Sequence, residues 1–172
     1  MSALDELHAV VRSEGGPVAL ELAGRPRGEP APQGAMLAGP RPAGRMEEYG
    51  LVVESIHEGY ELHHAQGRLF DGPDGDLAVL LGDHMYALGI ERLVQLGDVH
   101  AVGELADTIA IASLAAARED AGLAESVWGA GASAVAHGQD DGHRAAKELA
   151  RAGRPSAFDA MRTSARRHAT SR

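Results

Sequence analysis

The stretch DLAVLLGDHMYALGIERLVQLG, residues 76–97, decides the fold of this chain, because it has the features of one long helix with both ends marked. Asp74 stands just before it, where an N-cap side chain is expected, and Gly97 stands at its end, where many helices have a glycine. The apolar residues of this stretch point in nearly every direction around the helix axis, which is typical of a helix buried on all sides. We therefore predict that it is the central helix of a bundle, or that it packs in a dimer interface.

Two glycines in this helix, Gly82 and Gly89, lie seven residues apart on one face. Because they lack a Cβ atom, they allow a neighbouring helix to approach closely. The same explanation applies to the run WGAGASAV, residues 128–135. We expect close helix contacts at both places.

Helical periods continue on both sides of this stretch. They predict helices over about 46–68, 99–118, 123–136 and 143–152, and a last helix in which Ser156 and Asp159 have the spacing of a capping box. No strand-like alternation occurs from residue 46 onward, and the aromatic content of 3% also disfavours an all-β domain. The sequence therefore predicts an all-α helical bundle domain over residues 46–168.

The first 45 residues have a different composition. Residues 1–14 are predicted to be a short amphipathic segment capped by Ser2, with Leu4, Leu7, Val10 and Val11 on one side. Residues 15–45 contain seven Gly and six Pro and show no apolar period, which predicts a disordered linker. This part is either a tethered binding motif or a leader without a function. At the other end, residues 169–172 are predicted to be a basic C-terminal end.

The charge of the chain argues against nucleic-acid binding, since its formal net charge is −9 and its six last arginines form only a short basic tail. Absence of cysteine excludes a disulfide framework and fits a reducing compartment. The most apolar stretch, residues 77–90, is interrupted by Asp83 and His84 and is shorter than the ~20 residues of a membrane span. Without a secretory signal either, the sequence predicts a cytoplasmic protein with no transmembrane segment.

A polar stripe on the helix over residues 46–68 is the candidate metal site. Glu54, His57, Glu61 and His64 are spaced by three, four and three residues, and the two Glu-x-x-His pairs have the spacing of di-iron bundles. Both pairs lie on one helix, about 10 Å apart at 1.5 Å per residue, so one dinuclear site needs ligands from elsewhere. Candidates for these further ligands are Asp83, His84, Glu91 and Asp107. The metal ligands that we predict are His57, Glu61, His64 and Asp83, for Mg²⁺ or a transition metal. A stripe of carboxylate–imidazole pairs in contact with solvent or a neighbouring helix is the alternative.

Asp83 is a carboxylate among Leu80, Leu81, Met85 and Leu88. Such a group has to be paired, hydrated or in the wall of a cavity, because burying an unpaired charge is costly. A structural hydrogen bond that fixes the register of the helix is one interpretation, and a ligand or metal site is the other.

Two segments of the chain resemble helices of the polyprenyl synthetases. The run ESIHEGYELHH, residues 54–64, has the family's Ile-His followed six residues later by another His. The segment DLAVLLGDHMYAL, residues 76–88, is similar to the family's Leu-Ala-Gly-Asp-x-Leu-x-x-x-Ala helix, and residues 91–102 are similar to the segment after it. The resemblance covers about residues 46–120 and implies part of the all-α isoprenoid synthase fold, in a family whose enzymes are commonly dimers.

The chain departs from this family at the residues that carry catalysis. The first aspartate-rich motif should begin at His64–Ala65 and is missing, as is the Arg-Arg-Gly element, and Asp140–Asp141 lacks the pattern of the second motif. In the family these aspartates hold the Mg²⁺ that clamps an allylic diphosphate. The resemblance therefore implies a truncated, degenerate relative without standard prenyl transfer.

Three functions follow as hypotheses. The first is a synthase-like helical protein that acts as an assembly or regulatory partner or binds an apolar isoprenoid ligand, as a homo-oligomer or with a protein partner. The second is a metal- or haem-binding helical module that uses the polar stripe. A residual enzyme that acts on an isoprenoid or similar diphosphate is the third.

Overall fold

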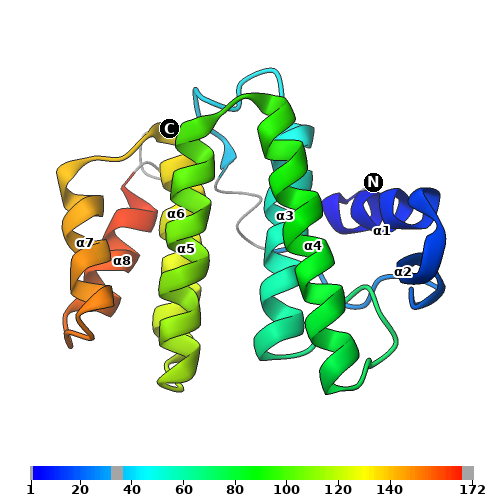
Figure 1. Cartoon of the computed structure of the whole chain (residues 1–172). Helices are drawn as coiled ribbons and strands as arrows, with labels where there is room; N and C mark the ends of the chain where they lie inside the picture. The colour runs from blue at the N-terminus through cyan, green and yellow to red at the C-terminus, as the bar shows by residue number, and fades with distance from the viewer. Residues whose placement is uncertain (1, 32–36, 168–172) are drawn as a thin grey trace. The chain divides into compact units, whose positions relative to one another are not determined.

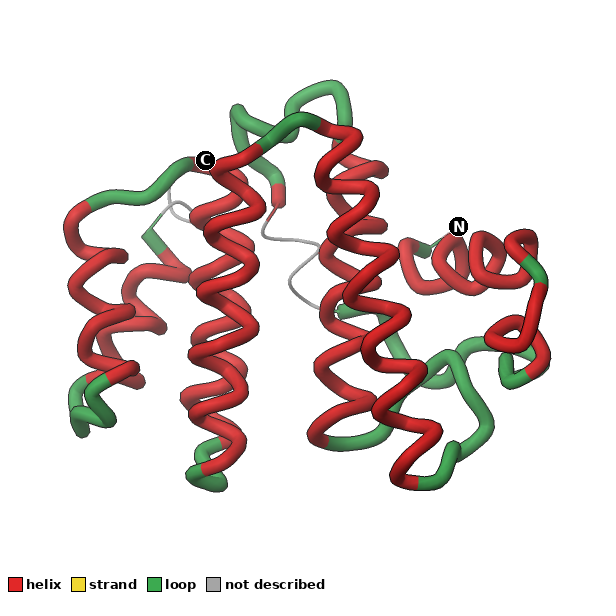
Figure 2. Tube along the Cα trace, in the orientation of Figure 1, coloured by secondary structure: helices red, strands yellow, loops and turns green. Residues whose placement is uncertain are grey.

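The computed structural model describes residues 2–31 and 37–167, and all regular elements among them are helices (Figures 1 and 2). The predicted all-α class is confirmed for this part of the chain. Its helices are α1 (Ala3–Glu14), α2 (Gly16–Leu20), α3 (Met46–His64), α4 (Gly75–Leu96), α5 (Val99–Ala117), α6 (Ala121–His137), α7 (Asp141–Arg151) and α8 (Ala157–Arg166). They divide between two compact units: unit 1 is Met1–Gly34 with Glu47–Gly97, and unit 2 is Ala35–Met46 with Asp98–Arg172. The domain predicted over residues 46–168 is thus shared between the two units.

Several helix ends follow the sequence signals. Ser2 forms a capping box with Asp5 at α1, and the Asp74 side chain accepts the Leu77 N–H at α4. Gly97 ends α4 with a φ of 71°, which only glycine adopts without strain. The predicted cap at Ser156 is wrong, since its side chain makes no hydrogen bond to the first turn of α8.

In unit 1, α3 and α4 pack closely at their glycines. A Cβ atom on Gly89 would lie 2.5 Å from Ile56 Cγ1, and one on Gly82 would lie 2.3 Å from the His63 ring. Gly59 of α3 is equally close, since its added Cβ would lie 2.9 Å from the Gly82 carbonyl oxygen. The expected close helix contact at Gly82 and Gly89 is confirmed, and the neighbour is α3.

The helix that is buried on all sides is α3, not α4. Every residue from Leu51 to Tyr60 is buried, including two glutamates and a histidine. By contrast, α4 exposes Val79, Leu80, Ile90 and Val94. Of the two alternatives predicted for residues 76–97, the central helix is therefore wrong, and packing in a dimer interface stays a prediction. The helical period of apolar residues does not reveal this, because Glu54 and Glu58 are polar residues that are buried with Arg68 as their partner.

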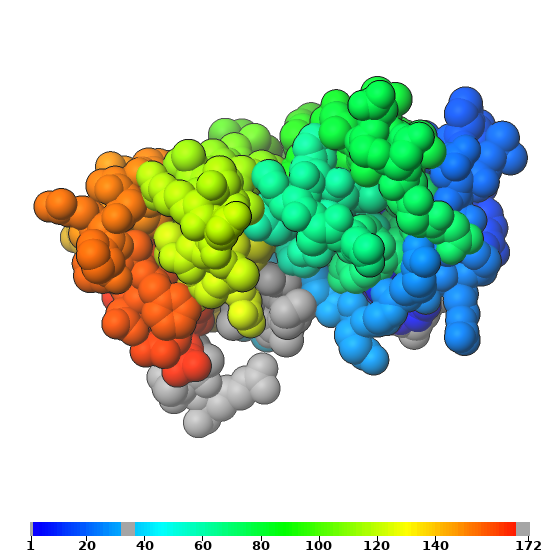
Figure 3. Space-filling model, turned by 90° about the horizontal axis from the view of Figure 1, so that it is seen from below, coloured from blue at the N-terminus to red at the C-terminus, as the bar shows by residue number. Residues whose placement is uncertain are grey.

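The predicted amphipathic segment at the N-terminus forms α1, which lies beside α3 and α4 in unit 1 (Figures 1 and 3). Its Leu4, Leu7 and Val11 are buried and join one apolar cluster with Leu51, Leu62, Leu69, Phe70, Leu81, Met85 and Leu88. The tertiary contact stabilises a helix that is too short to be stable alone.

The predicted linker, residues 15–45, differs from the structure in its described part. The N–H groups of Ala23 and Arg27 donate to the carbonyls of Leu69 and Arg68 at 2.8 and 2.9 Å, and Ala31 donates to Glu54. Composition predicted disorder because the segment buries little apolar surface, but its backbone groups find acceptors in unit 1. Residues 32–36 of this segment, and the predicted basic end over residues 169–172, lie outside the described residues.

Unit 2 packs α5 to α8 with equally close contacts. A Cβ atom on Gly131 of α6 would lie 2.1 Å from the Thr108 Oγ1 of α5, so the expected close contact in the run 128–135 is confirmed at this residue. Within the described residues, α5 alone is long and apolar enough to cross a membrane by length and composition, a test that core helices of other proteins also pass. The sequence had placed the most apolar stretch in residues 77–90. In unit 2, α5 carries the buried Glu104, whose carboxylate binds α7.

We expect Gly89→Ala to destabilise unit 1 by about 1–3 kcal/mol, because the added methyl group overlaps Ile56 and forces the packed helices apart. The matched control is Gly50→Ala in α3, where the nearest atom is 3.9 Å away, and the gain in helix propensity should stabilise by about 0.5–1 kcal/mol. Thermal unfolding followed by far-ultraviolet circular dichroism measures both. Equal effects of the two changes would contradict the close packing.

Candidate functional site

Two buried glutamates of α3 hold the loop that follows this helix. The Glu58 carboxylate is fully buried and accepts the Arg68 and Leu69 N–H groups at 2.5 and 2.9 Å. Its other oxygen lies 3.0 Å from Arg68 Nε, and Arg68 Nη1 lies 2.8 Å from Glu54. The N–H groups of Arg68 and Leu69 reach Glu58 only where the chain leaves the helix and turns back. The helix α3 therefore ends at His64 and not at the predicted residue 68.

Glu54 ties the N-terminal segment to the same arginine. Its carboxylate accepts the Ala31 N–H at 2.9 Å, and Arg68 also donates to the Glu29 carbonyl at 3.1 Å. Burial raises the pKa of Glu54 by more than the charge of Arg68 and the Ala31 hydrogen bond lower it. Burial and the Arg68 charge lower the pKa of His57 to about 3, so this imidazole is neutral at pH 7.

The structure does not bring the four predicted metal ligands to one point. His57 Nε2 lies 3.7 Å from Glu61 Oε1, while the His64 ring packs on Tyr60 with centroids 4.7 Å apart. Asp83 instead lies 3.2 Å from the Nε2 atom of His63. Within residues 2–31 and 37–167, no group of three or more His, Asp or Glu side chains is placed to hold a metal ion. A metal at this stripe stays a prediction.

Asp83 lies on the outer face of α4, and its side chain is 66% exposed. The sequence had placed it among apolar residues where a charge needs a partner or a cavity, and water together with His63 meets that need. Of the alternatives that the sequence left open, Asp83 is hydrated and paired, because it lies on the exposed side of α4.

A cavity of about 540 Å³ lies in unit 1 where the resemblance places the missing first aspartate-rich motif. Its wall contains Leu62, Ala65, Pro73 and Ala78 together with Arg27 and Arg68. Both guanidinium groups already have carboxylate partners, Arg27 with Asp71 and Arg68 with the two buried glutamates of α3. The cavity therefore has no guanidinium without a carboxylate partner to offer a diphosphate.

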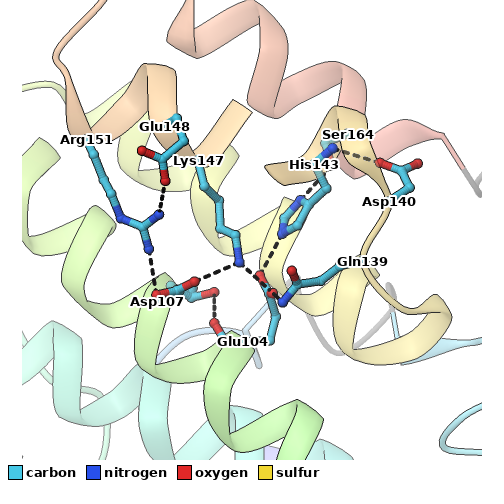
Figure 4. A network of polar contacts seen from close by, with 10 residues as sticks. Glu104, Asp107, Gln139, Asp140, His143, Lys147, Glu148, Arg151 and Ser164 are labelled. Carbon is cyan, nitrogen blue, oxygen red and sulfur yellow. Dashed lines mark hydrogen bonds and ion pairs between the residues drawn. The ribbon is translucent and has the colours of Figure 1, made fainter. Parts of the chain in front are cut away.

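Unit 2 contains a second network of buried charges, around Glu104 of α5 (Figure 4). The fully buried Glu104 carboxylate lies 2.7 Å from His143 Nε2, 3.0 Å from Lys147 Nζ and 2.6 Å from Gln139 Nε2. Lys147 also donates to Asp107 at 2.7 Å, and Arg151 donates to the other oxygen of Asp107 at 2.6 Å. These ion pairs connect α7 to α5.

Ser164, His143 and Glu104 form a hydrogen-bonded chain of hydroxyl, imidazole and carboxylate, the groups of a nucleophilic triad. His143 Nδ1 lies 2.8 Å from Ser164 Oγ. The adjoining cavity has a volume of about 10 Å³, which is room for one water molecule. Ser164 and His143 are buried and the hydroxyl is bound to the imidazole, so we assign this hydrogen-bonded chain to the packing of α5, α7 and α8.

The sequence contained a signal for this network that the helical periods did not reveal. His143, Lys147 and Arg151 follow one another at spacings of four on α7, and Glu104 and Asp107 are three apart on α5. Two complementary stripes on neighbouring helices predict ion pairs. Asp140 stands just before α7, where its side chain accepts the His143 N–H at 2.7 Å and caps the helix.

The outer face of α4 carries a row that we call the α4 seam, formed by Leu80, Asp83, Ala87, Ile90 and Val94. Leu80 and Val94 are 66% and 65% exposed, Ile90 is 45% exposed, and Ala87 and Asp83 are exposed too. Val79 beside it is also 45% exposed. Exposed apolar residues that gather on one face of a helix are typical of interaction surfaces.

Comparisons of the chain with protein-family models, with curated proteins and with solved structures found no match. The function is therefore inferred from the residues of this chain alone.

Acid is expected to weaken unit 2 through Glu104. Burial raises the pKa of this carboxyl, but the hydrogen bonds and charges of His143 and Lys147 lower it by more, to below its ordinary value of 4.5. Because the folded pKa is lower than the unfolded one, the stabilisation is present above about pH 4.5 and is lost as the pH falls. We expect Glu104→Gln to cost about 3–5 kcal/mol at pH 7 and to flatten the decline towards pH 3.

The single tryptophan, Trp128, is buried in α6 and reports this unfolding by its fluorescence. Asp159→Asn removes an exposed ion pair and serves as the control, with a change below about 0.5 kcal/mol. If the free energy of unfolding of Glu104→Gln depends on pH as that of the wild type does, other groups cause the acid sensitivity.

The metal prediction is tested by the metal content of the purified chain and of His57→Ala. If His57, Glu61, His64 and Asp83 hold an ion, the wild type binds it stoichiometrically and His57→Ala and Asp83→Asn both lose it. The geometry leads us to expect equal metal content in all three, since Asp83 pairs with His63 and not with His57. Haem is checked in the same samples by visible absorbance.

Proposed function

We propose that this chain is a helical protein on part of an isoprenoid synthase-like fold that lacks prenyl-transfer catalysis and acts as an assembly partner. It binds another protein through the α4 seam. The cytoplasm is the proposed compartment.

The observation that carries the proposal is the apolar exposure of the α4 seam. Leu80 and Val94 leave about two thirds of their surface in water, although α4 is otherwise packed on α3 through Gly82 and Gly89. Covering such residues stabilises a complex by ~25 cal/mol per Å² of apolar surface removed from water. A helix with one packed and one exposed apolar face suits a docking element.

The absence of prenyl transfer is supported by the side chains where the resemblance places catalysis. His64–Ala65 stands in place of the first aspartate-rich motif. The nearby carboxylates of α3, Glu54 and Glu58, are buried and bound to Arg68 and to backbone N–H groups. Such carboxylates serve the fold and are not open to Mg²⁺. An isoprenoid ligand in the cavity of unit 1 stays a prediction.

Site-specific photo-crosslinking tests the docking function. A photoreactive residue replaces Ala87 in the middle of the seam, and the same residue at the exposed Glu47 of α3 is the control. We expect a crosslinked species of one defined mass from Ala87 in cells, none of that mass from Glu47, and its loss when Leu80→Asp is added. Since Leu80 is 66% exposed, this change leaves the circular dichroism spectrum intact. Crosslinking at Ala87 that Leu80→Asp does not alter would refute docking through the seam.

A further inference from the structure

We infer that the occupant of the α4 seam is a helix of another protein with a basic side chain opposite Asp83, and not a second copy of this chain. This inference rests on the proposed function, whose docking surface it uses.

The seam has the spacing of a coiled-coil contact. Its five positions are separated by three, four, three and four residues, which is the alternation that keeps one stripe of a helix facing a partner helix. Four of the positions are apolar and one, Asp83, carries a charge. A single charged residue in such a stripe favours partners that carry a complementary group, because any other helix removes the charge from water without replacing its interactions.

Pairing with a second copy buries Asp83 without a counterion. In a parallel pair in register, Asp83 of one copy lies opposite Asp83 of the other, and like charges repel. In an antiparallel pair that sets Leu80 opposite Ile90, Asp83 lies opposite Ala87. The carboxylate is then desolvated twice with no partner across the interface. His63 contacts Asp83 from within unit 1, and most of the carboxylate side chain, 66%, still faces outward.

The charge around the seam points to a basic partner. Unit 1 contains fifteen Asp or Glu against five Arg, so two such units repel at long range. Glu91, which is exposed next to Ile90, adds a second negative group on the edge of the seam. His84, on the other side of Asp83, already lies 3.6 Å from Glu14. An apolar helix with Arg or Lys at the position opposite Asp83 satisfies the carboxylate and keeps the apolar contacts.

The test uses the full chain and changes only Asp83, whose exposure makes folding of the variants a simple check by circular dichroism. Sedimentation equilibrium of the wild type should show a monomer. Asp83→Leu completes the apolar seam and should self-associate at least about tenfold more tightly than the wild type. The chain that carries Asp83→Arg supplies the basic helix: alone it should be a monomer, and mixed with the wild type it should form a one-to-one complex that salt weakens.

The matched control is Glu47→Arg, which changes the net charge equally at an exposed position outside the seam and should not bind the wild type. Self-association of the wild type that Leu80→Asp abolishes would overturn the inference but support docking through the seam. A monomeric Asp83→Leu chain, or an Asp83→Arg chain that ignores the wild type, would also overturn it. The crosslink at Ala87 tests the proposed function separately, so the two failures are distinguishable.

Discussion

The fold of unit 1 depends on the two carboxylates that α3 carries inward and on Arg68, which binds both. Glu58 fixes the backbone at Arg68 and Leu69 in the loop after the helix, and Glu54 fixes the backbone at Ala31. Buried charges of this kind are costly unless every lone pair has a donor, and here arginine and backbone N–H groups supply them. The contact joins three segments that are far apart in sequence and leaves the apolar cluster to fill the space around them.

Unit 2 repeats this solution with different residues. Glu104 takes the place of the buried acceptor, and its partners are His143 and Lys147 of α7 and Gln139 from the loop before this helix. A bundle with so many alanines and glycines has little large apolar surface to set the register of its helices. Buried ion pairs add directional constraints that alanine contacts lack, which is one use attributed to such networks.

Local signals in the sequence predicted α1 and the helices from α3 onward with several of their ends, because capping by Ser2 and Asp74 or termination at Gly97 depends only on neighbouring residues. The short helix α2 lies in the segment that was predicted as a linker. The positions of Gly82 and Gly89 also revealed that a helix would pack on that face. What periodicity missed was which helix lies inside: Glu54 and Glu58 count as polar, and their burial depends on Arg68, beyond the helix end. The candidate metal site could be predicted only in part for the same reason. Spacing along one helix places His57 and Glu61 together, but it does not show which residue of α3 lies next to Asp83 of α4.

Lys147 is the only lysine of the chain, and it is 5% exposed with its amine between two carboxylates. An amine in that position is shielded, so reagents that acylate lysine react with it only when α7 separates from α5. The rate of acylation at this one side chain therefore follows the local opening of unit 2, in the way that amide exchange follows the opening of backbone hydrogen bonds. Acylation of Lys147 therefore measures how often α7 separates from α5 in the folded protein.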